Sequence, residues 1–152
     1  MLFDHVCRVL GTNNMLPRLD ATNYKTYIRD LDMALFGGYL LQRVSISILH
    51  SKEIDVAAKR LMRITGDVFI ILLNISDGIN TGGDVGGVAC RSVPRCIEQL
   101  LQHEFMHVIV MRVNHELHMT INDNAGHSRL FRVWLQKIFG QHRADNSLLQ
   151  KI

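Results

Sequence analysis

Apolar residues in the first quarter of the chain recur at the spacing of amphipathic helices. Within residues 20–36 the apolar positions that share one face are Tyr24, Ile28, Leu31 and Leu35. This spacing predicts a helix, and Gly37-Gly38 follows it where a left-handed C-terminal cap is needed. A shorter helix is predicted over residues 2–10, with Gly11 ending it. Its inward-facing residues are Leu2, Val6 and Leu10.

The pattern then changes to that of β-strands. Residues 43–49 alternate apolar and polar side chains, which is typical of a half-buried strand. Residues 68–75 form a denser apolar and β-branched run, which is typical of a more buried strand. The segment between them has apolar residues at helical spacing, namely Ile54, Ala58 and Leu61. We favour a helix there over the alternative, in which residues 60–65 form a strand that enters a hairpin at Gly66-Asp67.

Residues 76–93 are rich in glycine and aspartate, so a surface loop is expected there. Long loops in compact domains are often functional. The segment contains neither G-x-x-x-x-G-K-[ST] nor G-x-G-x-x-G, so nothing specific indicates phosphate binding. Because the chain shows no internal repeat, low-complexity tract or domain boundary, we predict a single domain over residues 1–152.

The residues after this loop predict a helix that carries the chemistry. Pro94 fits the first turn of a helix. The apolar stripe that follows consists of Ile97, Leu101, Phe105 and Val108. The same helix contains H-E-F-M-H over residues 103–107. At about 100° per residue, His103 and His107 lie about 40° apart on one face, so both imidazoles can reach a single tetrahedral zinc ion.

Glu104 lies between the histidine face and the apolar stripe, in a largely enclosed position. An unpaired carboxylate is costly there. A zinc-bound water offers compensation, because the metal lowers the pKa of that water towards about 7 and the carboxylate can accept its proton. A chance pattern is the alternative, since H-E-x-x-H arises by accident in roughly a few per cent of chains of this size. An accident would more often fall on a solvated stretch than inside an apolar helix.

A hydrolytic zinc site needs a third protein ligand and an open position for water. The metzincin arrangement is excluded, because Val113 stands ten residues after His103 where a histidine is required. A downstream glutamate ligand would have to be Glu116. It lies only nine residues after His107, which leaves little room for the chain to turn back.

His127 is the preferred third ligand, because it precedes the apolar stripe of another predicted helix. That stripe consists of Phe131, Trp134, Leu135 and Ile138. His115 and His118 remain alternatives on the expected loop of residues 114–124. Asp123 is the least favoured ligand and a candidate to orient an imidazole through its second nitrogen.

The amino-acid composition excludes several further classes of protein. Apolar residues make up 47% and charged residues 20%, which excludes a disordered or collagen-like chain. The longest apolar run, residues 68–73, is too short to cross a bilayer, and Asp4 stands where a signal peptide needs apolar residues. Three cysteines without C-x-x-C spacing predict neither a disulfide framework nor a zinc ribbon. We therefore expect an intracellular protein, neither secreted nor membrane-bound.

Charge is unevenly distributed. The whole chain carries a formal net charge of +3, whereas residues 126–152 hold five Lys or Arg and one Asp, a net +4. This segment could contact an anionic partner.

Three segments together resemble the SprT-like (Spartan-type) zinc metallopeptidases. LFGGYLLQRVSISIL (residues 35–49) is similar to that family's helix, glycine-containing turn and edge strand. CIEQLLQHEFMHVIV (residues 96–110) resembles its H-E-x-x-H helix, and NAGHSRLF (residues 124–131) resembles its G-H-G-x-x-F segment. Ser128 departs from the family's glycine, and the stretch between His107 and His127 is a few residues longer than expected. These differences leave the ligands in place and bear on the fit of a substrate.

The resemblance implies an α+β, zincin-like fold, with a small, mainly antiparallel sheet packed on helices that include the H-E-x-x-H helix. It implies a zinc-dependent endopeptidase with one catalytic Zn²⁺ on His103, His107 and His127 and with Glu104 as general base. It also implies protein substrates bound or crosslinked to DNA. Two alternatives stay open: another intracellular zincin that cleaves a regulatory protein without DNA, and a non-catalytic binding module that zinc stabilises.

Overall fold

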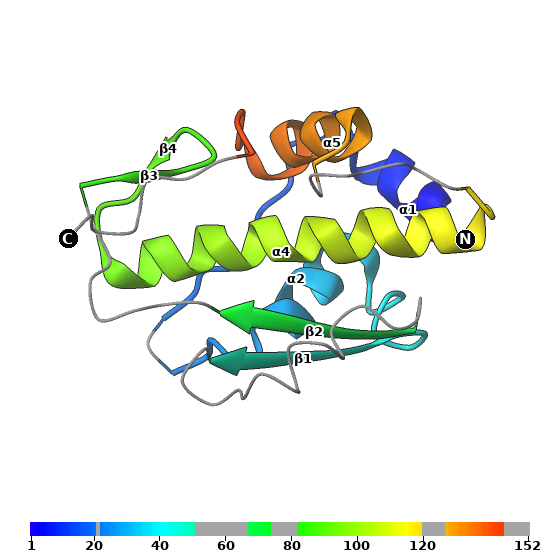
Figure 1. Ribbon diagram of the computed structural model, residues 1–152, viewed down its shortest axis with the longest axis horizontal. Helices are drawn as coiled ribbons and strands as arrows, with labels where there is room; N and C mark the ends of the chain where they lie inside the picture. Colours follow the sequence, from blue (N-terminus) through cyan, green and yellow to red (C-terminus); the bar gives the residue numbers. More distant parts are fainter. Residues whose placement is uncertain (21, 51–66, 74–81, 120–126, 145–152) are drawn as a thin grey trace.

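The computed structural model spans residues 1–152 and describes all of them except 21, 51–66, 74–81, 120–126 and 145–152. The long helix α4 (Val93–Glu116) runs across the centre of the molecule (Figure 1). In that view, strands β1 (Ser45–His50) and β2 (Val68–Leu73) lie on one side of α4, and helix α5 (Arg129–Phe139) lies on the other. The α+β class is confirmed, whereas the single domain over residues 1–152 stays a prediction.

Helix α1 (Leu2–Val9) forms where its pattern predicted, with Leu2 and Val6 fully buried and the left-handed Gly11 just beyond its end. The backbone N–H of Leu2 donates to Oε2 of Glu116 at 2.8 Å. The carboxylate at the C-terminal end of α4 therefore binds the N-terminus of α1, where the helix dipole favours negative charge.

Helix α2 (Tyr27–Phe36) starts later than the predicted residue 20. Oδ1 of Asp20 accepts hydrogen bonds from the backbone N–H groups of Thr22 and Asn23, at 2.8 and 3.1 Å. This local bonding competes with helix formation and holds a turn. The C-terminal end agrees with the prediction, because Gly37 caps the helix with a left-handed φ of 60°.

Strands β1 and β2 pair in parallel, with Ser45 opposite Val68. The expectation of a mainly antiparallel sheet is therefore wrong for the longer pair of described strands. Antiparallel pairing occurs only in a two-residue pair, β3 (Asp84–Val85) with β4 (Val88–Ala89), within the described chain. A parallel connection needs about a dozen residues or more, and residues 51–67 supply 17. The helix favoured over residues 51–66 lies outside the described residues.

The β3–β4 hairpin lies inside the segment 76–93, for which a surface loop was predicted. Its turn is formed by Gly86 and Gly87, both with positive φ. The backbone N–H groups of His142 and Arg143 donate to the carbonyl oxygen of Gly86 at 2.8 and 3.0 Å. A Cβ on Gly87 would collide with the His142 ring, so the chain that follows α5 can lie against the hairpin only because this residue is glycine.

Cys90 and Cys96 form a disulfide that joins the end of the hairpin to the first turn of α4. Their Cα atoms are 5.2 Å apart, within the range that a disulfide requires. Both cysteines are buried, while Cys7 is free and exposed. The expectation of no disulfide is thus wrong for this pair, because the fold brings together two cysteines whose spacing matches no short motif.

The hydrophobic core surrounds α4, which contacts α1, α2, α5 and β2. Phe105, Ile109 and Leu101 of α4 are fully buried, as is Phe131 of α5. Among the described residues, no helix combines the length and apolar character needed to cross a membrane.

Candidate metal centre

Helix α4 carries two of the predicted ligands and is longer than expected. Oγ of Ser92 accepts a hydrogen bond from the backbone N–H of Arg95, and Pro94 lies in the first turn, as predicted. The helix continues to Glu116, although a loop was predicted from residue 114. One cause is an ion pair between Arg112 and Glu116, which lie one helical turn apart. Nε of Arg112 is 3.0 Å from Oε1 of Glu116.

The imidazoles of His103, His107 and His127 converge, with one ring nitrogen from each lying within 4.8 Å of the others. Nε2 of His127 lies 3.2 Å from Nε2 of His103. Two nitrogens bound to one tetrahedral zinc at about 2.05 Å are about 3.3 Å apart, so this separation fits a shared metal ion. The three residues are therefore placed closely enough to hold a metal.

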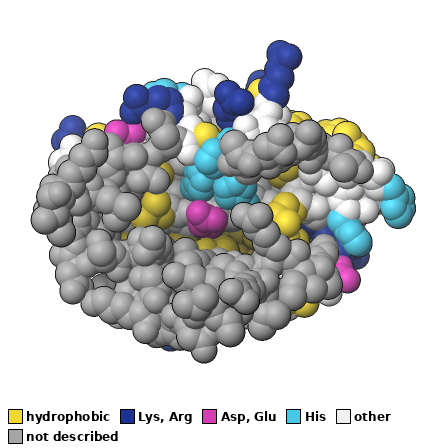
Figure 2. Space-filling model, in the orientation of Figure 1, with side chains coloured by type: hydrophobic (Ala, Val, Ile, Leu, Met, Phe, Trp, Pro, Cys, Tyr) yellow, Lys and Arg dark blue, Asp and Glu magenta, His cyan; other side chains and the backbone are white. Residues whose placement is uncertain are grey.

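Figure 2 shows a group of histidine side chains near the centre of the face in view, with an acidic side chain beside them and Lys or Arg side chains along one rim. All three ligand candidates are half-buried. Each is thus partly removed from water and partly exposed.

The start of α5 sets the position of His127. Oγ of Ser128 accepts a hydrogen bond from the backbone N–H of Phe131 at 3.2 Å, so Ser128 is the N-cap of α5. Nε of Arg132 donates to the carbonyl oxygen of His127, also at 3.2 Å. Ser128 therefore has a local role, which is to begin the helix directly after the third histidine.

Phe131 is a site residue that the sequence pattern identified only as part of an apolar stripe. Its ring stacks on that of His107, with the centroids 4.3 Å apart. It also contacts the rings of His103 and His127, each with a centroid distance of 5.1 Å. The only sequence signal for this role was its place in the G-H-G-x-x-F-like segment. A fully buried ring in contact with all three imidazoles restricts their rotation.

Burial also sets the protonation of the two histidines on α4. It lowers the pKa of His103 to about 3, with further lowering by the neighbouring His107 and His127. Burial, followed by the proximity of His127, lowers the pKa of His107 to about 4. Both rings are therefore neutral at pH 7, which is the form that binds a metal.

Glu104 follows His103 on α4 and is half-buried. No described residue forms a hydrogen bond or ion pair with its carboxylate. Burial raises the pKa of Glu104 to about 7, close to the value that suits a general base at neutral pH.

The alternative ligands are not part of this cluster. His115 lies in the last turn of α4 and His118 follows that helix, and both are exposed. The Glu116 carboxylate already contacts Arg112 and the N-terminus of α1. Asp123 lies outside the described residues. Among the described residues, only His103, His107 and His127 form such a group.

Comparison with known proteins adds no relative: no family model, no curated protein and no solved structure matches this chain.

Proposed function

We propose that this protein is a zinc-dependent endopeptidase of the SprT-like type. The observation that carries the proposal is the convergence of two imidazoles from α4 and one from the residue before the N-cap of α5, next to a glutamate without a partner among the described residues. His103, His107 and His127 would hold one Zn²⁺, which supplies Lewis acidity that activates water and polarises a carbonyl.

Glu104 acts as the general base in this proposal. Its carboxylate takes a proton from the attacking water and later gives it to the leaving amine of the cleaved peptide bond. The raised pKa of Glu104, about 7, supports both steps, because a group with such a pKa accepts and releases protons readily at neutral pH. The neutral imidazoles keep their lone pairs available to the metal.

The substrates that we propose are proteins bound or crosslinked to DNA. Support comes from α5, where the exposed Arg129 and Arg132 follow His127 within five residues and Lys137 is exposed further along. Cations near a cleavage site would hold a phosphate backbone by long-range attraction that weakens with salt. Cleavage of a regulatory protein without DNA is the alternative, and the two differ in whether DNA stimulates proteolysis.

A non-catalytic, zinc-stabilised module is the other alternative. Structural zinc sites are closed by four protein ligands, whereas catalytic sites have three and an open position. The described residues supply three. This difference favours catalysis.

The test measures zinc content and proteolysis for the parent, Glu104→Gln, His127→Ala and the control His118→Ala, each with and without single-stranded DNA. We expect one zinc per chain in the parent, in Glu104→Gln and in the control. His127→Ala should lose zinc and activity together, and Glu104→Gln should lose activity alone. A parent that binds zinc but cleaves no protein under any condition would contradict the peptidase and support the structural module.

A further inference from the structure

The β3–β4 hairpin packs on α4 through a small cluster of its own. In Figure 1 the hairpin lies beside the N-terminal end of α4. The buried members of the cluster are Val85 of the hairpin, Cys90 and Cys96, and Leu100 of α4 packs against them. None of these three buried residues belongs to the main hydrophobic core of the described chain. The hairpin can therefore move without disturbing that core.

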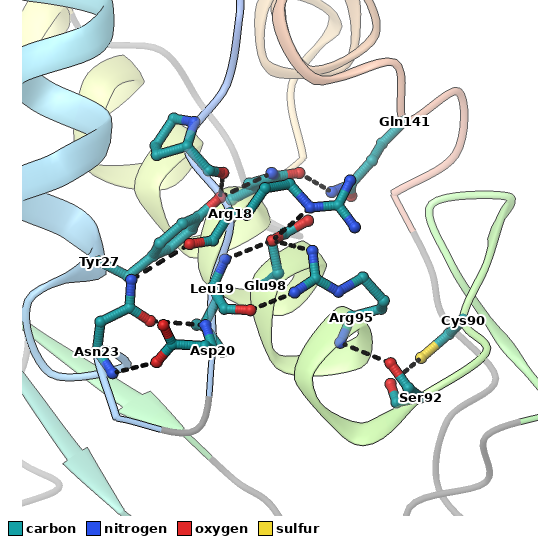
Figure 3. A network of polar contacts seen from close by, with 12 residues as sticks. Arg18, Leu19, Asp20, Asn23, Tyr27, Cys90, Ser92, Arg95, Glu98 and Gln141 are labelled. Carbon is teal, nitrogen blue, oxygen red and sulfur yellow. Dashed lines mark hydrogen bonds and ion pairs between the residues drawn. The ribbon is translucent and has the colours of Figure 1, made fainter.

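The Cys90–Cys96 disulfide ties the end of the hairpin covalently to the first turn of α4. Figure 3 shows Cys90 on the chain that leads into α4, close to Ser92. Cys90 is 1% exposed and Cys96 is fully buried. The two cysteines are six positions apart. A cross-link over so short a loop restricts the unfolded chain only modestly, so we expect the main core to stay folded without it.

The hairpin also holds the chain after α5 (residues 140–144). The carbonyl oxygen of Gly86 accepts hydrogen bonds from the backbone N–H groups of His142 and Arg143, at 2.8 and 3.0 Å. Nη2 of Arg143 donates to Oδ2 of Asp84 in β3 at 2.8 Å. Two backbone bonds and one ion pair thus join the chain after α5 to a hairpin that the disulfide fixes on α4.

Gln141 connects the same chain to α4 underneath the hairpin. Its Nε2 donates to the backbone carbonyl of Gln99 at 3.0 Å and lies 3.4 Å from Oε1 of Gln102. Figure 3 shows Gln141 extending from the chain after α5 toward α4. Gly86 packs directly on it, because a Cβ on Gly86 would lie only 2.5 Å from Cβ of Gln141. Release of the hairpin would therefore admit water to Gln141, and water competes for its hydrogen bonds.

We propose that the Cys90–Cys96 disulfide is a redox-sensitive latch, which a dithiol reductant opens and an oxidised dithiol closes. In the opening reaction a thiolate of the reductant attacks one sulfur, the S–S bond breaks, and the second thiol of the reductant resolves the mixed disulfide. Two electrons and two protons pass to Cys90 and Cys96, and the reductant becomes a cyclic disulfide. Because both sulfurs are buried, the reaction proceeds when the hairpin moves away from α4 by local opening.

The open latch loosens the hairpin and the chain after α5 but leaves the metal centre in place. Cys96 precedes His103 by seven residues, which is about 10 Å along the helix. The three imidazoles contact Phe131, which belongs to the main core. The two redox states therefore differ at one end of α4.

The test compares oxidised and reduced parent by hydrogen–deuterium exchange, after a chelator has removed any metal that the dithiol could bind. In the reduced protein the backbone N–H groups of Cys90, His142 and Arg143 should exchange at least about tenfold faster, while those at the centre of α4 stay unchanged. The melting temperature should fall by about 5 °C. Alkylation in denaturant should label Cys7 alone before reduction and all three cysteines after it.

Two variants control for other effects of the reductant. Cys7→Ser should respond to the dithiol as the parent does. The double variant Cys90→Ala/Cys96→Ala should exchange like the reduced parent from the start and should not respond to the dithiol. Oxidised dithiothreitol should restore slow exchange in the reduced parent and have no effect on the double variant. Zinc content should be equal in the parent and the double variant.

Three results would overturn the proposal. The first is the appearance of two new thiols without faster exchange at His142 and Arg143, because the disulfide would then hold nothing in place. The second is unfolding of the whole chain on reduction, which would make the disulfide a general support of the fold. The third is failure of oxidised dithiothreitol to form the disulfide in the folded protein. None of these results bears on the proposed peptidase.

Discussion

Three glutamates on α4 have different surroundings, and the contrast separates the ends of this helix from its centre. Glu98, near the N-terminal end, binds Arg95 and the backbone of Leu19. Glu116, at the C-terminal end, binds Arg112 and the N-terminus of α1. Glu104, at the centre, has no such partner among the described residues.

The position of each glutamate in the fold decides what its carboxylate does. At the ends of α4 the carboxylates join segments that are distant in the sequence, and they offset their desolvation through charged hydrogen bonds. At the centre, a half-buried carboxylate that has no partner among the described residues lowers stability. The convergence of three imidazoles beside it provides a chemical reason for that cost.

The largest expected effect is on activity at the centre. Glu104→Gln should lower proteolysis by about 10²- to 10⁴-fold, because the amide cannot accept a proton. Thermal unfolding of the variant should occur at the same temperature as in the parent or higher, since the substitution removes a half-buried charge that no described residue pairs with. Proteolysis at the parent rate would show that Glu104 is not the base.

Substitution of a glutamate at an end of α4 should instead change the stability of the protein and leave the metal centre intact. Glu98→Leu should lower the free energy of unfolding by about 3 kcal/mol, because Arg95 and the Leu19 N–H lose their acceptor. Denaturant titration measures this change, with the exposed Arg18→Gln as a control that should cost less than about 1 kcal/mol. At temperatures where Glu98→Leu is folded, its zinc content should equal that of the parent. A loss below about 1 kcal/mol would mean that the cluster adds little to the fold.

A smaller effect is expected from the packing around the imidazoles. Phe131→Leu should weaken zinc binding by roughly tenfold, because the rings of His103, His107 and His127 gain freedom to rotate, and should cost about 1–2 kcal/mol of stability. Phe139→Leu is the matched control, since it lies on the same helix and contacts Phe105. It should cost a similar stability without changing zinc affinity, and equal zinc losses in both variants would contradict a specific role for Phe131.

The smallest effect concerns the helix cap next to the third histidine. Ser128→Ala should cost about 1 kcal/mol by removing the acceptor for the Phe131 N–H, whereas Ser128→Gly, the residue of the SprT-like pattern, should cost only a few tenths. Melting temperatures of the three proteins test this order. Equal melting temperatures for the alanine variant and the parent would show that the cap is not needed.

Much of the local structure could be predicted from the sequence, since it depends on nearby residues. The spacing of apolar residues located α1 and the stripe of α5, and Gly37 marked the end of α2. The spacing of His103 and His107 on one helical turn likewise follows from helix geometry alone. The late start of α2 was missed because Asp20 forms a turn of its own. The extension of α4 was missed because Glu116 pairs with Arg112 and also binds the N-terminus of α1.

By itself, the sequence determined which residue types are available for metal chemistry and which two share a helical face, because helical geometry is fixed by the backbone. Only the tertiary structure brought His127 to those two, paired β1 with β2 in parallel, joined Cys90 to Cys96 and packed Phe131 against all three imidazoles. These contacts link residues far apart in the chain or outside any recognisable spacing. These contacts form only when whole helices and strands pack together, and the local pattern of residues does not determine that packing.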